Sequence, residues 1–92
     1  LYDSKVAAKW HKLAAEQGFA PSQLKLSKLY SSGAGVIFSP ELAHMWANIA
    51  TSNGEKDSRE FMNYLSQRMS ENQLEKALDL ARECVGKNFI GC

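Results

Sequence analysis

Glycine and proline are scarce in this 92-residue sequence, with six and two residues respectively, and they stand far apart. A fold of many short strands needs turn residues at close intervals, so a many-turned all-β architecture is excluded and helices are favoured. The sequence also lacks a long apolar run and the apolar segment of a signal peptide, so no membrane span is predicted. Its formal charge of +1 argues against the strongly basic surface that is typical of nucleic-acid-binding proteins.

The residues that are present indicate one small globular domain. Apolar residues make up 45% and charged residues 23%, which is ordinary for a globular protein. A chain of this length buries a modest share of its surface, so its core needs efficient packing or help from neighbouring segments. Because the chain starts at Leu1 rather than at a Met, we expect it to be part of a longer protein, with any targeting signal upstream.

The sequence repeats itself with an offset of 36 residues. The two tryptophans, Trp10 and Trp46, are separated by this interval, and so are Gly18 and Gly54. A period in the thirties is typical of stacked helix-turn-helix units. Each Trp is expected to fill the space that the small residues on its helix leave open. The same offset relates Ala7 to Ala43, Ala14 to Ala50, Ser22 to Ser58 and Leu29 to Leu65.

Capping residues indicate where the helices begin. Asp3 and Ser39 are N-cap candidates one period apart, and Ser70 with Gln73 has the spacing of a capping box. The domain, residues 1–92, then divides into five parts. We expect 3–18 to be the second helix of a truncated repeat, 20–54 to be a complete repeat, 56–69 and 70–85 to be a final helix pair with its cap, and 86–92 to be a tail.

The repeat carries a characteristic spacing of Ala, Trp, Leu and Gly. The pattern runs through Ala7-x-x-Trp10-x-x-x-Ala14-Ala15-Glu16-Gln17-Gly18, then Ala20-x-x-Gln23-x-x-Leu26-x-x-Leu29-Tyr30-x-x-Gly33-x-Gly35-Val36, then Ala43-x-x-Trp46-x-x-x-Ala50 with Gly54. It resembles the Sel-one-like repeat (SLR) family, a relative of the tetratricopeptide repeats, over roughly residues 3–65. Ser27 stands where the family often has Gly, and the segment 69–84 resembles the closing helix of bacterial members.

The resemblance implies an all-α fold, a right-handed α-α solenoid of about five helices that ends in a capping helix. Such proteins act mainly as adaptors, so it implies a bacterial-type protein–protein interaction scaffold that binds a protein or peptide. Catalytic residues, a cofactor, a metal, nucleic acid and membrane insertion are not expected. The bacterial periplasm or secretion is favoured over the cytoplasm, although the sequence leaves the compartment open.

The first helix of each pair lines the concave face in this fold class, and it supplies the candidate ligand-binding residues. Lys25 and Lys28 lie off the apolar stripe of the helix expected at 20–32, and Phe61 and Tyr64 occupy the same positions one period later. The alternative is that the lysines are solvated and that the aromatic rings pack against the closing helix. The candidate set is Leu24, Lys25, Lys28, Glu60, Phe61 and Tyr64.

Two other functions fit parts of the sequence. Ser22 and Lys25 have the Ser-x-x-Lys spacing of penicillin-recognising enzymes, and some cysteine-rich relatives of the family are linked to β-lactams, so a β-lactam-binding or hydrolysing enzyme is one alternative. The Ser-Asp-Asn and Lys-Thr-Gly partners of that motif are absent. A purely structural segment is the other alternative, one that ends a solenoid or dimerises through the uncovered side of Trp10 and Leu13.

The histidines and cysteines do not have the spacing of an ordinary metal site. His11 and His44 have no suitable partner three or four residues further along the chain. Cys84 and Cys92 are the only cysteines, with seven residues between them. They can close a loop in an oxidising compartment or remain free thiols in a reducing one, and we favour the disulfide. Cysteine-rich SLR proteins use the same spacing, but their bridges join the helices of one repeat.

Overall fold

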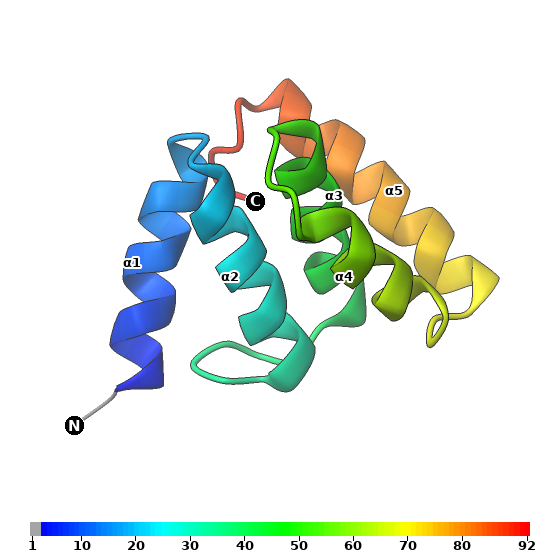
Figure 1. Ribbon diagram of the computed structural model, residues 1–92, viewed down its shortest axis with the longest axis horizontal. Coiled ribbons are helices and arrows are strands. Elements are labelled where there is room, and N and C mark those ends of the chain that lie inside the picture. Colours follow the sequence, from blue (N-terminus) through cyan, green and yellow to red (C-terminus); the bar gives the residue numbers. More distant parts are fainter. Residues whose placement is uncertain (1–2) are drawn as a thin grey trace.

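The computed structural model describes residues 3–92, which form five α-helices and no β-strand (Figure 1). The predicted all-α class and the predicted number of helices are therefore confirmed for this part of the chain. The tail that follows the last helix forms turns. The helices are α1 (Ser4–Glu16), α2 (Ala20–Ser32), α3 (Pro40–Ser52), α4 (Ser58–Ser66) and α5 (Glu71–Gly86).

The predicted N-caps begin three of the helices. The Asp3 carboxylate accepts hydrogen bonds from the backbone amides two and three residues further along. The Ser39 hydroxyl accepts one at 3.1 Å from the amide three residues further along. Ser70 and Gln73 form a reciprocal capping box before α5. Each bond satisfies a backbone donor that has no partner within the first turn of its helix.

The helix bounds repeat with the offset of the sequence. Helix α1 covers residues 4–16 and α3 covers residues 40–52, so both ends lie one period apart. Gly18 and Gly54, which follow these helices, have φ angles of +87° and +92°. Glycine adopts this left-handed conformation without a steric penalty, and it lets the chain turn directly into the next helix.

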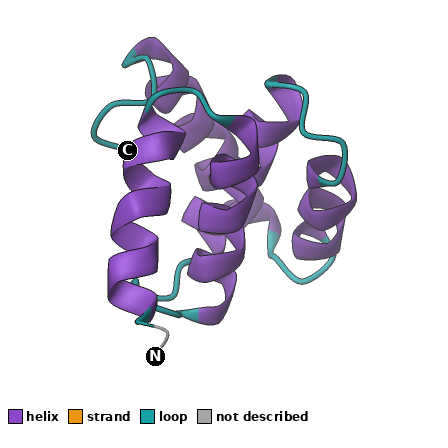
Figure 2. Cartoon of the chain, turned by 60° about the vertical axis from the view of Figure 1, so that its left-hand side comes forward, coloured by secondary structure: helices purple, strands orange, loops and turns teal. Residues whose placement is uncertain are grey.

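Helix α3 lies at the centre of the packing. Helices α2, α4 and α5 all pack against it, whereas α1 packs mainly against α2 (Figure 1). Helices α4 and α5 have little contact with one another, so the last two helices do not repeat the close pairing of α2 with α3. Figure 2 shows that the connecting loops lie at the helix ends and that the C-terminal tail returns towards α1.

The hydrophobic core surrounds α3. Trp46 and Leu26 are completely buried, and Leu65 from α4 and Cys84 from α5 belong to the same cluster. Small side chains on α3 allow the neighbouring helices to approach closely. The large indole of Trp46 fills the space beside these small side chains. The fully buried alanines of α3 are Ala43, Ala47 and Ala50.

Two buried polar side chains join α2 to its neighbours. Gln23 Nε2 donates to the carbonyl of Ala15 at 3.0 Å, and Gln23 Oε1 accepts from Asn53 Nδ2 at 3.0 Å. Ser27 donates its hydroxyl to the carbonyl of Ala43. Because these buried groups are hydrogen-bonded, they help to set the positions of α1, α2 and α3 without the cost of an unpaired polar atom.

The C-terminal tail folds back onto the turn between α1 and α2. A disulfide joins Cys84, near the end of α5, to Cys92. The Gly91 amide donates a hydrogen bond of 3.0 Å to the Glu16 carboxylate. The C-terminal tail is therefore held against the end of α1, which the sequence pattern alone does not indicate.

Candidate functional site

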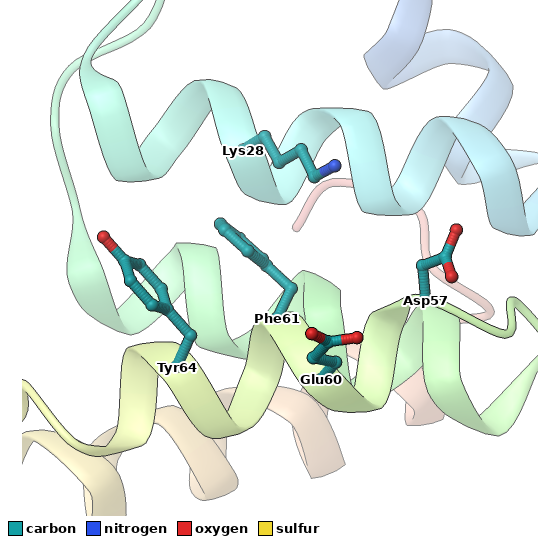
Figure 3. A pocket seen from close by; sticks show the side chains of 5 residues that line it. All are labelled: Lys28, Asp57, Glu60, Phe61 and Tyr64. Carbon is teal, nitrogen blue, oxygen red and sulfur yellow. The ribbon is translucent and has the colours of Figure 1, made fainter.

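Helices α2 and α4 border an open pocket of about 310 Å³ (Figure 3). Four of the six candidate residues line it, namely Lys28 from α2 and Glu60, Phe61 and Tyr64 from α4, together with Asp57. In sequence order, Asp57, Glu60, Phe61 and Tyr64 follow the i, i+3, i+4, i+7 spacing of one helix face, which directs their side chains to the same side. The structure therefore brings together most of the candidate set, although a binding role for it remains a prediction.

Two aromatic rings form one wall of this pocket. Phe61 and Tyr64 stack with their ring centroids 5.7 Å apart and their planes inclined by 17°. Lys28 Nζ lies 5.7 Å from the Phe61 centroid, and Arg68 Cζ lies 3.9 Å from the Tyr64 centroid. Contacts of this kind contribute about 0.5–1 kcal/mol at exposed sites, so they help to hold the rings in place. Tyr64 is still 48% exposed and offers a surface to a ligand.

The pocket carries more negative than positive charge. Asp57 and Glu60 contribute two carboxylates and Lys28 contributes one ammonium group, which leaves one net negative charge. Within residues 3–92, none of these three side chains forms an ion pair. In Figure 3 the ammonium group of Lys28 points along the pocket towards the end at which Asp57 lies. All three charges are therefore available to a ligand.

A second pocket, of about 180 Å³, adjoins the first at Tyr64, which lines both. It is more apolar, and two large side chains beside it are uncovered, since Phe38 is 60% exposed and Ile37 is 89% exposed. We call the two pockets together the α2–α4 groove. The second pocket is lined by Ser31, Phe38, Pro40, Tyr64, Leu65, Arg68 and Met69.

Sequence reasoning missed seven of the residues that line the groove, and three of them show why. Asp57 precedes Phe61 by four residues and Arg68 follows Tyr64 by four, so extending the helical spacing in both directions would have found them. Phe38 lies in the loop between α2 and α3, where no periodic pattern exists. Only the packing of this loop against α4 places Phe38 beside the groove.

Two of the predicted ligand-facing residues lie outside the groove. Leu24 is only 7% exposed and offers almost no surface to a ligand, because α2 is packed against both α1 and α3. Lys25 is exposed but does not line either pocket. Ser22, the nucleophile of the alternative enzyme, is 6% exposed, and no hydrogen bond links it to Lys25 in the described part of the chain.

The two side chains whose pKa values are shifted do not line the groove. Burial lowers the pKa of His44 and raises the pKa of Tyr30. Residues 3–92 contain no cluster of three or more side chains suited to bind a metal ion. Over the same residues, no helix combines the length and the apolar character that crossing a bilayer requires.

The outer face of α1 is apolar and uncovered. Val6, Trp10 and Leu13 each expose roughly half of their surface or more. One period later, Trp46 and Ile49 are buried under neighbouring helices. The apolar face of α3 is therefore covered by neighbouring helices, whereas the matching face of α1 is exposed.

Comparison with known proteins adds no relative to this picture. No protein-family model matches the chain, and no curated protein matches its sequence. The class defined by the fold and the site is an all-helical protein with an open, partly charged groove between two helices.

Proposed function

We propose that this chain is a protein–protein interaction module of the Sel-one-like repeat type, which holds a protein or peptide segment in the α2–α4 groove and catalyses no reaction. The observation that carries the proposal is the meeting of Lys28, Glu60, Phe61 and Tyr64 around one open pocket. The shared 36-residue offset of α1 and α3 supports the assignment to a helical repeat class.

The character of the groove supports binding of a protein rather than chemistry on a small molecule. Its larger pocket, at about 310 Å³, is near the lower limit of small-molecule sites and is open to solvent. Exposed aromatic and Arg side chains are typical of the residues that dominate binding energy at protein interfaces. Burial of Ser22 argues against a β-lactam hydrolase, since the attacking hydroxyl must reach its substrate.

Peptide display against the immobilised 92-residue chain tests the proposal. Selected peptides are measured with the native chain and with Tyr64→Ala. Tyr64→Ala is expected to weaken binding by roughly tenfold or more, the effect of removing an interface aromatic residue. Leu78→Ala is the control, because Leu78 is an exposed, large apolar residue on α5 outside the groove. Equal effects of Tyr64→Ala and Leu78→Ala in folded variants would reject the groove.

The uncovered face of α1 favours a second role, self-association as a dimer. Val6, Trp10 and Leu13 form an apolar face, and a helix that buried it would remove a large hydrophobic surface from water. Light scattering of the native chain is expected to show a concentration-dependent rise in mass that Trp10→Glu removes. A monomer mass at every concentration would reject this role and leave the groove proposal intact.

A further inference from the structure

The α2–α4 groove has two chemically different ends. The end near Asp57 and Glu60 is polar and has a net negative charge, while the end near Phe38 and Met69 is mostly apolar. Tyr64 belongs to both pockets and connects them. A ligand that fills the whole groove therefore needs two kinds of side chain at a fixed separation.

The polar end favours a cation. Asp57 and Glu60 have no ion-pair partner within residues 3–92, and the face of the Phe61 ring attracts positive charge. Lys28 already provides one ammonium group over this ring, but a single cation leaves one carboxylate charge uncompensated. An Arg or Lys side chain from a partner would complete the compensation and use the same aromatic wall.

An acidic ligand fits this end less well. Among residues 3–92, Lys28 is the only cation that lines the polar pocket, and an incoming carboxylate would meet Asp57 and Glu60 beside it. Arg68 is already engaged, since its guanidinium group stacks on Tyr64 and donates a hydrogen bond of 3.2 Å to the Tyr64 carbonyl. Like charges brought together at an interface oppose binding.

The apolar end favours a large hydrophobic side chain. Its pocket of about 180 Å³ is bordered by Phe38, Leu65 and Met69, and the loop that contains Phe38 also leaves Ile37 uncovered. Burying these exposed surfaces against a Leu, Ile, Met or Phe side chain removes apolar surface from water, which favours binding.

The length of α4 sets the separation of the two ends. The carboxylates of Asp57 and Glu60 stand eight and five residues before Leu65, which borders the apolar pocket. A helix rises about 1.5 Å per residue, so the two ends lie about 10 Å apart. An extended segment covers this distance with about three residues. We infer that the groove selects protein segments in which a basic residue and a large apolar residue stand about three positions apart. This inference rests on the proposed interaction role.

An oriented library of synthetic, fluorescently labelled peptides tests this inference on the complete 92-residue chain. The library varies two positions three residues apart through basic, acidic, polar and apolar residues. Peptides with Arg or Lys at one position and Leu, Ile, Met or Phe at the other are expected to bind tightest. Their binding is expected to weaken with added salt, because charge pairs at an exposed site are screened.

Three variants test whether the preference for basic peptides depends on the charged residues of the groove. The double variant Asp57→Asn, Glu60→Gln is expected to weaken the selected basic peptides by roughly tenfold, and Asp57 makes no capping hydrogen bond whose loss would disturb α4. The control is Glu71→Gln, Glu75→Gln, which removes the same charge from exposed positions on α5. Lys28→Met removes the competing cation, so it is expected to strengthen binding of the same peptides by roughly two- to fivefold.

The outcomes separate this inference from the proposed function. Preference for acidic peptides, or weaker binding of the basic peptides to Lys28→Met, would overturn the inference. Tyr64-dependent binding of peptides that carry no basic residue would also overturn it, while the groove would remain a binding site. Absence of any Tyr64-dependent peptide would remove both the proposed function and the inference.

Discussion

The indole of Trp46 is completely buried, whereas that of Trp10, at the same position one period earlier, is 62% exposed. The two helices have matching bounds, so local structure does not cause the difference. It arises because α3 is packed against α2, α4 and α5, while α1 is packed mainly against α2. Trp10 and Trp46 therefore contribute differently to stability, although they occupy matching positions in two helices of equal length.

Replacing Trp46 by Ala is expected to lower the free energy of unfolding by about 3–5 kcal/mol, the range for emptying an aromatic core site. The loss is one of packing, because Trp46 Nε1 has no hydrogen-bond partner in the described part of the chain. Trp10→Ala is the matched control and is expected to cost less than about 1 kcal/mol. Chemical denaturation at low protein concentration measures both. A loss below about 1 kcal/mol for Trp46→Ala would contradict its central place in the core.

Gly35 is expected to tolerate no side chain. Its φ is +77°, and a Cβ at this position would overlap the carbonyl group of Ser4 at the start of α1. Gly35→Ala is therefore expected to cost about 2–5 kcal/mol, from the left-handed backbone and from the overlap together. Gly54→Ala is the control, since Gly54 has a φ of +92° but no neighbouring atom within 4 Å. If thermal denaturation shows equal losses for both variants, the loop does not press against α1.

Stability is expected to fall on mild acidification because of His44. Ser66 Oγ lies 3.0 Å from His44 Nε2 and donates its hydroxyl to the Met62 carbonyl, while within residues 3–92 the buried His44 Nδ1 has no hydrogen-bond partner. Burial lowers the pKa of His44 in the folded state below its ordinary value of about 6.5. The folded protein then binds a proton less readily than the unfolded chain, so stability is complete above about pH 6.5 and declines as the pH falls below it.

Urea denaturation between pH 5 and pH 8 measures this decline, which reaches at most about 1.4 kcal/mol per pH unit for one group. His44→Gln is expected to flatten the dependence whatever its effect on overall stability. His11→Gln leaves His44 in place and is expected to retain the native slope. An unchanged slope in His44→Gln would show that another group is responsible.

The disulfide is expected to stabilise the folded chain by limiting the unfolded state. Cys84 and Cys92 close a short loop, for which the chain-entropy relation gives roughly 2–3 kcal/mol. The same loop holds the Phe89 ring against Gly18, so opening it also loosens the contact between the tail and the α1–α2 turn. Cys92→Ser is expected to lower the midpoint of thermal unfolding, and a reductant should do the same to the native chain. A further effect of reductant on Cys92→Ser would point to a cause other than this bond.

Much of the fold is predictable because its signals act over short distances along the chain. Asp3, Ser39 and Ser70 bond to amides within the next turn, so the starts of α1, α3 and α5 can be predicted without knowledge of the rest of the protein. Part of the groove is predictable for a similar reason. Glu60, Phe61 and Tyr64 share a helix face, and that face is defined by the helical period.

The remaining features depend on which segments meet after the helices have formed. Burial of Leu24, exposure of Trp10 and the place of Phe38 beside Tyr64 all follow from contacts between segments that no local pattern relates. The hydrogen bond from Gly91 to Glu16 joins residues that are 75 positions apart in the sequence. Capping and periodicity act within a few residues and so determine where the helices lie along the sequence. Burial and the shape of the groove depend on neighbours from distant segments, which are defined only by three-dimensional packing.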